Sequence, residues 1–387
     1  LFYNDITQMS RLHRSASRQM SRPAVTLRNS GSWTFGSPSV LMMYYRAPGE
    51  LGKELAEMYE CMPHYYKITN GHGRGAELLM DAEAAYLQGA WEKAAVLLER
   101  ARADAAGQEN MTLCCDFLAL RLALCGKGKE GYDFAAKRAA LLQKHDGVQV
   151  HLLESIAAYF YALQGRPEQA PELFREHKLA EVSFFGPCRP MMSLIEQQVW
   201  LAQGEYVKVI AHSEGLLRRC EAMHYGLVGL QARIQLAAAQ LRFGQRAEAR
   251  AALAAALLDA VQDDFWVLFV EQYPALAPLL EGEDWAVCEP RLGPFVARIL
   301  PAGRAFAVRL GLPAPAPELP LTDRDRELAR LVAGRCTNKE IAAALYLSEG
   351  TVKQYINQLY AKLDMGGDPR TRRARLAEWY QKNAPRN

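Results

Sequence analysis

Three polar side chains, Lys353, Gln354 and Asn357, lie close together in the segment TVKQYINQLYAKL near the carboxy terminus. The amides of Gln and Asn can each make two hydrogen bonds with adenine N6 and N7, and Lys can donate to guanine O6 and N7. A helix face that is only solvated more often carries a mixture of Glu and Lys. These residue types therefore predict hydrogen bonding to the edges of DNA bases.

The helix that must position these side chains is expected over residues 349–363, with Ser348 as its N-cap. Apolar residues recur at i, i+4, i+7 and i+11, which predicts one buried stripe. The members of this stripe are Val352, Ile356, Leu359 and Leu363. At 100° per residue, Gln354 and Asn357 fall opposite the stripe, with Lys353 at the margin of that face. We therefore expect the polar face to enter the major groove.

Two shorter helices are predicted before this one. The first is expected from Thr322, as N-cap, to about Val332, with Gly334 ending it. The second opens at Thr337, where Glu340 three residues later completes a capping box. Both are close enough in sequence to pack against the apolar stripe of the third helix.

The segment resembles the LuxR-type helix-turn-helix, whose pattern is close to LTxRExEVLxLxAxGxxNKEIAxxLxxSxxTVKxHIxxIxxKL. The matching positions are Leu321, Thr322, Arg324, Glu327, Gly334, Asn338 to Ala342, Leu345, Ser348, Thr351 to Lys353, Ile356, Lys362 and Leu363. The resemblance implies a four-helix DNA-binding domain over residues 321–387.

The resemblance also implies a role for each site residue. The positions matching Lys353, Gln354 and Asn357 face base edges, as the helical geometry predicts. Those matching Asn338, Lys339 and Thr351 lie near the DNA backbone. Tyr355 stands where the family usually has His, so a phosphate or sugar contact there would come from a phenol.

Basic residues are concentrated in this domain. Residues 321–387 hold 13 Lys and Arg against 8 Asp and Glu, whereas the whole chain has a net charge of only +3. Phosphate binding requires such a local excess. The cluster Arg370, Arg372, Arg373 and Arg375 fits a solvated helix face as well as it fits a DNA-backbone contact. We expect double-stranded DNA as a partner, a homodimer on DNA, and RNA polymerase as a further partner.

Residues 49–310 are predicted to form helical repeats. A glycine ends one amphipathic helix shortly before the next begins, at intervals of 37, 39, 39 and 40 residues: Gly89, Gly126, Gly165, Gly204 and Gly244. This spacing indicates stacked helix pairs in an all-α superhelix. It is similar to tetratricopeptide repeats, with a longer period than their 34 residues. With the carboxy-terminal domain, it resembles the sensor region of MalT-like regulators, which implies control by a ligand or partner.

Two segments flank the repeats. Residues 1–48 hold six Arg and a single acid, Asp5, and are interpreted either as an interface with an upstream nucleotide-switch domain or as a solvated arm. The chain is expected to be a carboxy-terminal fragment. Residues 311–320, GLPAPAPELP, predict a Pro-rich linker. Residues 49–320 hold 34 acidic and 27 basic residues, so the repeats are expected to mask the groove face of the carboxy-terminal domain partly at low salt.

Other classes of function find little support in the sequence. The chain shows no membrane span and no signal peptide, so a cytoplasmic location is expected. The eight cysteines have no metal-ligand spacing and are expected to be reduced core residues. Gly126, Gly128 and Gly131 satisfy GxGxxG but follow no predicted strand. We expect no catalytic residues, no metal and no cofactor, and the residues that bind an effector are unknown.

The sequence thus predicts a transcription regulator with repeats that sense a signal. The alternative is a protein-interaction scaffold in which the repeats bind a partner and the terminal domain is only a docking bundle. Salt dependence distinguishes the two, because DNA binding releases counterions and weakens steeply with salt.

Overall fold

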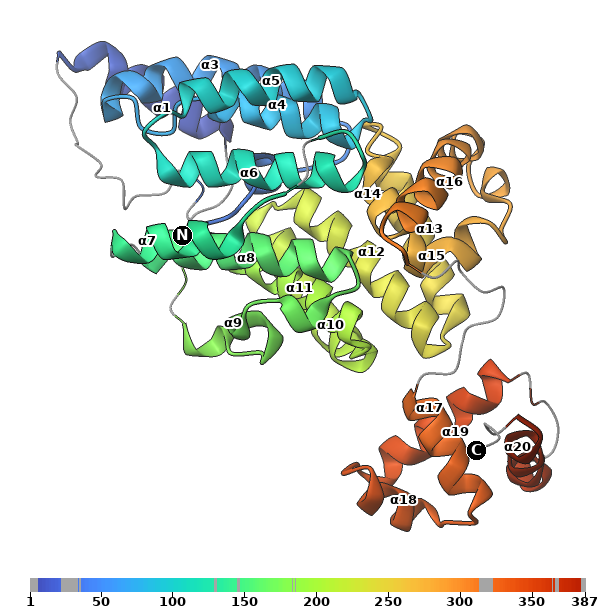
Figure 1. The fold of residues 1–387 in the computed structure, drawn as a ribbon. Helices are drawn as coiled ribbons and strands as arrows, with labels where there is room; N and C mark the ends of the chain where they lie inside the picture. The colour runs from blue at the N-terminus through green and yellow to red at the C-terminus, as the bar shows by residue number, and fades with distance from the viewer. Residues whose placement is uncertain are drawn as a thin grey trace.

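The computed structural model describes residues 6–21, 34, 36–128, 131–144, 147–182, 184, 186–312, 323–363, 365 and 369–383, and these residues form helices and no strand. The helices before the linker are α1 Ile6–Gln19, α2 Val40–Tyr44, α3 Leu51–Thr69, α4 Ala76–Leu87, α5 Trp91–Asp104, α6 Glu109–Leu124, α7 Phe134–Gln143, α8 Gly147–Leu163, α9 Glu172–Arg175, α10 Arg189–Gln203, α11 Tyr206–Met223, α12 Gly226–Phe243, α13 Arg246–Ala260, α14 Val267–Glu271, α15 Tyr273–Leu280 and α16 Leu292–Arg309. The C-terminal domain contains α17 Asp323–Ala333, α18 Asn338–Ala344, α19 Glu349–Lys362 and α20 Pro369–Asn383. Figure 1 shows the first group stacked in layers and the second as a separate body.

The five glycines at near-regular intervals each follow a long helix, as predicted. Gly89, Gly126, Gly165, Gly204 and Gly244 have φ between 68° and 90° and follow α4, α6, α8, α10 and α12. Glycine adopts this left-handed conformation without steric cost, and it lets the last carbonyls of a helix be satisfied. The regular spacing of the glycines therefore marks the ends of five long helices.

The third helix pair departs from the expected pattern. Its second member is the four-residue helix α9, preceded by a 3₁₀ turn over Pro167–Gln169. Proline lacks a backbone N–H and disfavours the helical conformation of the residue before it. Pro167 and Pro171 therefore divide the segment that the repeat pattern assigned to one amphipathic helix.

The sequence predicts a domain boundary at residue 48, but residues on both sides of this position share one hydrophobic core. Val40, Leu41 and Met42 of α2 are fully buried in the cluster that holds the repeat helices together. The backbone N–H of Leu41 donates to the Glu83 carboxylate of α4 at 2.7 Å. Helix α1 packs along α3. The described residues of the expected basic segment are therefore part of the repeat body.

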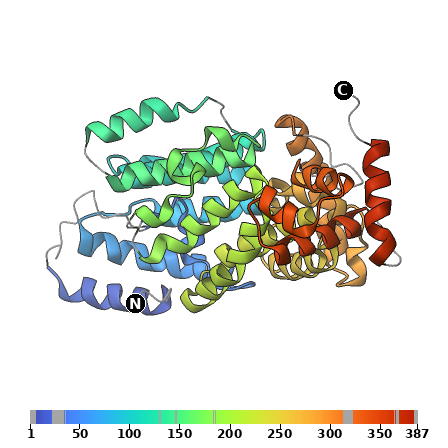
Figure 2. The ribbon, with the colours of Figure 1, turned by 90° about the horizontal axis from the view of Figure 1, so that it is seen from below.

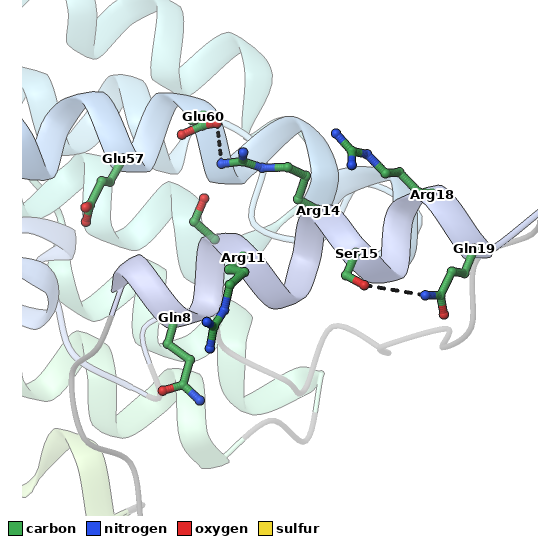
Figure 3. Close-up of a pocket in the computed structure, with 9 residues that line it drawn as sticks. Gln8, Arg11, Arg14, Ser15, Arg18, Gln19, Glu57 and Glu60 are labelled. Atoms are coloured by element: carbon green, nitrogen blue, oxygen red, sulfur yellow. Dashed lines mark hydrogen bonds and ion pairs between the residues drawn. The ribbon is translucent and has the colours of Figure 1, made fainter.

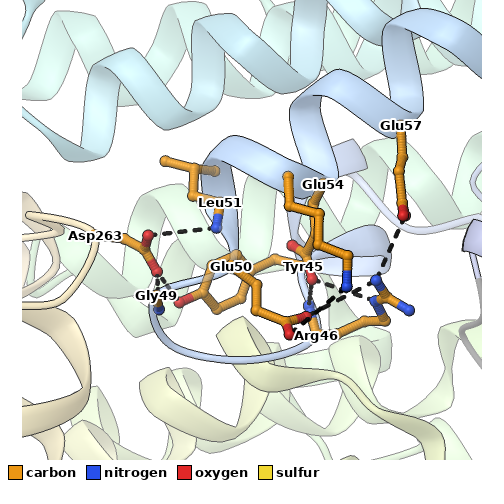
Figure 4. A network of polar contacts seen from close by, with 9 residues as sticks. Tyr45, Arg46, Gly49, Glu50, Leu51, Glu54, Glu57 and Asp263 are labelled. Atoms are coloured by element: carbon orange, nitrogen blue, oxygen red, sulfur yellow. Dashed lines mark hydrogen bonds and ion pairs between the residues drawn. The ribbon is translucent and has the colours of Figure 1, made fainter.

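Polar contacts join the beginning of the repeats to their end. Figure 4 shows Asp263, after α13, accepting hydrogen bonds from the Tyr45 hydroxyl and the Gly49 N–H at 2.6 Å each, and from the Leu51 N–H at 3.3 Å. A simple solenoid has contacts only between neighbouring repeats. Here Asp263 contacts residues near position 50, and one core cluster includes side chains from α2 to α16.

A buried ion pair lies inside this core. Arg121 of α6 donates to Glu271 of α14 at 2.8 and 3.1 Å, and the two residues are 2% and 4% exposed. The hydroxyls of Tyr86 and Tyr159 also donate to Glu271, at 2.7 and 3.1 Å. The carboxylate is therefore well satisfied despite its burial, as a buried charge must be. The network connects α4, α6 and α8 to α14.

Candidate DNA-reading surface

Local capping sets the start of the second and third helices of the C-terminal domain. Thr337 and Glu340 form the predicted capping box, with Glu340 N–H donating to Thr337 Oγ1 at 3.2 Å and Thr337 N–H donating to Glu340 at 2.6 Å. Ser348 accepts from the N–H of Thr351 at 3.1 Å and caps α19. These bonds satisfy backbone donors that the first turn of a helix leaves free.

The turns between the helices use residues with positive φ. Helix α17 ends at Ala333, next to the predicted stop at Gly334, but the left-handed residue is Arg335 with φ of 61°. Tyr346, between α18 and α19, has φ of 54° and is 95% exposed. The predicted N-cap Thr322 lies outside the described residues. The order of helix, turn and helix agrees with the expected helix-turn-helix.

The apolar stripe of α19 is buried as predicted. Val352, Ile356 and Leu359 are at most 4% exposed, and they pack with buried side chains of α17, α18 and α20. Leu363 is only half-buried, and Tyr360 joins the core instead at 7% exposure. This cluster is separate from the repeat core. The C-terminal domain therefore has a small core of its own that fixes the rotation of α19.

The three predicted base readers lie on the free side of that helix. Lys353, Gln354 and Asn357 are all exposed, and their side chains make no hydrogen bond or ion pair with another residue of the described part of the chain. Helix α19 has 14 residues and is about 21 Å long at 1.5 Å per residue. Helix α19 thus exposes two amides and one ammonium group on one side and packs its other side in the core.

The four predicted backbone-contact residues have different environments. Lys339 is exposed at the start of α18, and Thr351 pairs its hydroxyl with that of Ser348 at 2.7 Å. Asn338 Oδ1 accepts from Arg373 Nη1 at 2.9 Å, which leaves the Asn338 amide N–H groups as donors. Tyr355 is half-buried against a residue of the repeats.

Arg373 has a structural contact that the sequence did not specify. Besides Asn338, its guanidinium bonds the carbonyl of Cys336, and so it ties α20 to the start of α18. The arginine cluster was noticed in the sequence, but neither of its two interpretations described this contact. Arg373 therefore orients Asn338, one of the proposed phosphate donors.

A second polar surface lies at the other end of the molecule. Arginines of α1 line an open groove of about 880 Å³ whose far wall includes Glu57 and Glu60 of α3 (Figure 3). Arg14 pairs with Glu60, and Glu57 pairs with Arg46 at 3.5 Å. The carboxylates of the groove are thus already neutralised by arginine.

Other kinds of site find no support in the described ranges. No three His, Cys, Asp or Glu side chains there gather closely enough to hold a metal ion. No helix in these ranges is long and apolar enough to cross a membrane. All eight cysteines are free, but Cys288 is exposed, so the expectation that every cysteine is a core residue was wrong. Cys288 follows the 3₁₀ turn over Trp285–Val287, and its thiol accepts a hydrogen bond from Arg250 Nη2 at 3.5 Å.

Comparison with known proteins gives matches to parts of other chains. Residues 319–371 match the model of the family described as bacterial regulatory proteins, luxR family. The chain is 41% identical over 75 residues to the uncharacterized transcriptional regulatory protein YvfU of Bacillus subtilis, which covers 19% of this chain and 36% of the relative. It is 42% identical over 65 residues to the DNA-binding transcriptional activator DevR/DosR of Mycobacterium tuberculosis, covering 17% and 29%.

A third relative is also named as a transcriptional regulatory protein. The transcriptional regulatory protein DesR of Bacillus subtilis is 46% identical over 46 residues, covering 12% of this chain and 23% of the relative. The chain thus spans about a third or less of the length of these curated relatives. No solved structure matches the chain. The capped helices, the buried stripe and the family match together show that the C-terminal part of the chain carries a helix-turn-helix domain of the LuxR family.

Proposed function

We propose that this chain is a transcription regulator that reads specific double-stranded DNA with α19 in the major groove. The observation that carries the proposal is the exposure of Lys353, Gln354 and Asn357 on one side of a helix whose other side is packed. A major groove about 12 Å wide admits a helix about 10–12 Å across with its side chains. Amide and ammonium groups on such a helix can distinguish adenine and guanine edges.

Phosphate contacts would set the position of α19 in the groove. Lys339 and Asn338 lie in the first turn of α18, and Thr351 lies in the first turn of α19. Helix N-termini favour anions because free N–H groups and the helix dipole point toward them. Tyr355 is proposed as a further backbone contact through its phenol. These contacts orient the domain, while the three base readers supply sequence preference.

The remaining parts of the proposal concern partners and control. The DNA-bound form is proposed to be a homodimer, with two α19 helices about one turn of DNA, roughly 34 Å, apart. RNA polymerase is the proposed protein partner at the promoter. The repeat region, which resembles tetratricopeptide repeats and the sensor of MalT-like regulators, is proposed to bind a small-molecule or protein effector in the cytoplasm.

The alternative function is an interaction scaffold whose terminal bundle only docks a protein. The exposed face of α19 disfavours it, because Lys353, Gln354 and Asn357 form a polar surface without large apolar side chains. A docking helix would instead present an apolar face to a groove. Salt separates the two functions, because binding through phosphates weakens steeply as salt rises.

Asn357→Ala tests the base-reading role. On the preferred site we expect a loss of about 1–3 kcal/mol in binding free energy, with relaxed preference at one base pair. Lys339→Ala is the matched comparison, because losing a phosphate contact should weaken binding to all sequences and lower the salt slope by about one. Affinities are measured on every single-base variant of the site. An Asn357→Ala loss that is equal for every variant would mean that Asn357 reads no base.

A further inference from the structure

One flank of α19 lies against the end of a repeat helix. The ring of Tyr355 sits 5.6 Å from the ring of Phe243, the last residue of α12, in an edge-to-face arrangement with an interplanar angle of 82°. The guanidinium of Arg324 in α17 lies 5.0 Å from the centre of the Tyr355 ring. Tyr355 is therefore held between a repeat aromatic and a cation of its own domain, both of which are favourable partners for its ring.

Two turns further along α19, Lys362 lies against Gly244, the residue that follows Phe243. Its side chain is only 4% exposed, and its Nζ donates to Asp325 at 2.6 Å. The stem of Lys362 covers Gly244, because a Cβ on that glycine would lie 2.9 Å from Lys362 Cγ. Tyr355 and Lys362 are seven residues apart and so share one flank of the helix. The turn after α12 thus fits against this flank with no room for a side chain at residue 244.

Charged groups of the two domains also act on each other's tyrosines. Burial raises the pKa of the Tyr355 phenol, Arg324 opposes the shift, and the negative charge of Glu205, the N-cap residue of α11, adds to it. Burial likewise raises the pKa of Tyr206, with Arg242 opposing and Asp325 of α17 adding to the shift. The charges of each domain are thus close enough to act on tyrosines of the other. In Figures 1 and 2 the C-terminal domain lies beside this end of the repeats.

The contact covers a different face from the one expected to be masked. Lys353, Gln354 and Asn357 remain exposed, so the base-reading face itself is open. However, a helix about 10–12 Å across nearly fills a major groove about 12 Å wide. The two phosphate strands then run along both flanks of the helix. Tyr355, which we propose as a backbone contact, lies on the flank that Phe243 and the turn after α12 cover.

We propose that Phe243 and the turn after α12 form a docking surface for the Tyr355–Lys362 flank of α19, and that docking and DNA compete for this flank. The docking does not depend on the proposed function, whereas the competition with DNA rests on it. Because the two bound states exclude each other, docking lowers the apparent DNA affinity by the fraction of molecules that are docked. An effector that moves the turn after α12 would release the domain without touching it.

Phe243→Ala in the full chain tests the docking. Phe243 is half-buried at a helix end and lies outside the main core, so the repeats should keep their fold. Loss of one aromatic pair should raise DNA affinity about twofold to tenfold. Small-angle scattering should show a larger radius of gyration. Tyr59→Ala, an exposed aromatic on α3 at the far end of the repeats, is the matched control and should change neither value.

Each result bears on a separate part of the proposal. Wild-type scattering and wild-type DNA affinity in Phe243→Ala would overturn the docking surface. An expanded molecule that binds DNA no more tightly would overturn the competition. Expansion in a chain that binds no DNA at all would leave the docking intact and refute the proposed function. If Phe243→Ala melts below wild type, Phe243→Leu keeps the apolar volume but removes the ring, and the same outcomes apply to it.

Discussion

The repeat region and the C-terminal domain differ in how deeply their main polar groups are buried. The repeats enclose Arg121 and Glu271 at 2% and 4% exposure and surround them with tyrosine hydroxyls. The C-terminal domain buries a compact apolar cluster and leaves Lys353, Gln354 and Asn357 in solvent. A large core can enclose a charge pair with its hydrogen-bond partners, whereas a small domain has little stability to offset such burial. The polar side chains on the free face of α19 are consequently available for binding, whereas Lys362 and Asp325 pair with each other beside the repeats.

The strongest test of this contrast is Arg121→Met. Removing one partner leaves the Glu271 carboxylate buried without its counter-ion, and such changes cost about 3–5 kcal/mol. We expect urea unfolding to show this loss in the repeat transition, with the C-terminal transition unchanged.

Arg233→Met provides the control for that experiment. Arg233 pairs with Asp259 where both side chains are 32% exposed, and exposed pairs contribute about 0–1 kcal/mol. Equal losses for the two variants would contradict the idea that burial sets the cost in the repeat core.

Ile356→Ala tests the other side of the comparison. Ile356 is 4% exposed in the small core, and removing buried methyl groups from such a site costs about 2–5 kcal/mol. The C-terminal domain should melt at a lower temperature while the repeats keep their transition. Val352→Ala, on the same stripe, should act in the same direction. Unchanged melting combined with lost DNA binding would place Ile356 in the groove and refute the orientation of α19.

A smaller effect is expected from the buried carboxylate of Glu83. Burial raises its pKa from the usual 4.5 to about 7, against hydrogen bonds from Leu41, Ser39 and Val40 and the charge of Arg121. The folded state then holds a proton that the unfolded state loses, so this stability is present below pH 4.5 and falls as pH rises through 7. Relative to Glu83→Gln, the wild type should lose about 1–3 kcal/mol between pH 4.5 and 8.

Chemical denaturation across that pH range measures the difference. Glu378→Gln, an exposed glutamate on α20, should give a profile parallel to wild type. A Glu83→Gln profile that is also parallel to wild type would show that Glu83 titrates normally in the folded protein.

The same contrast explains what the sequence could predict. The capping box, the N-cap of α19 and the glycine helix ends are local patterns, and the structure confirms them at Thr337, Ser348 and Gly244. Contacts between distant residues leave no such pattern. The pairing of Arg121 with Glu271 spans 150 positions, and the contact of Tyr355 with Phe243 joins the C-terminal domain to the end of a repeat helix. Periodicity and spacing report only which residues neighbour each other along one element.

Selection of bound DNA from a random duplex pool by the full chain tests the central claim most directly. We predict enrichment of a defined motif, with half-sites about one helical turn apart, and an affinity that falls steeply as salt rises. Lys353→Ala run in parallel should enrich a less specific motif. A pool that stays random after repeated rounds, or binding that salt leaves unchanged, would contradict the assignment of α19 as a DNA-reading helix.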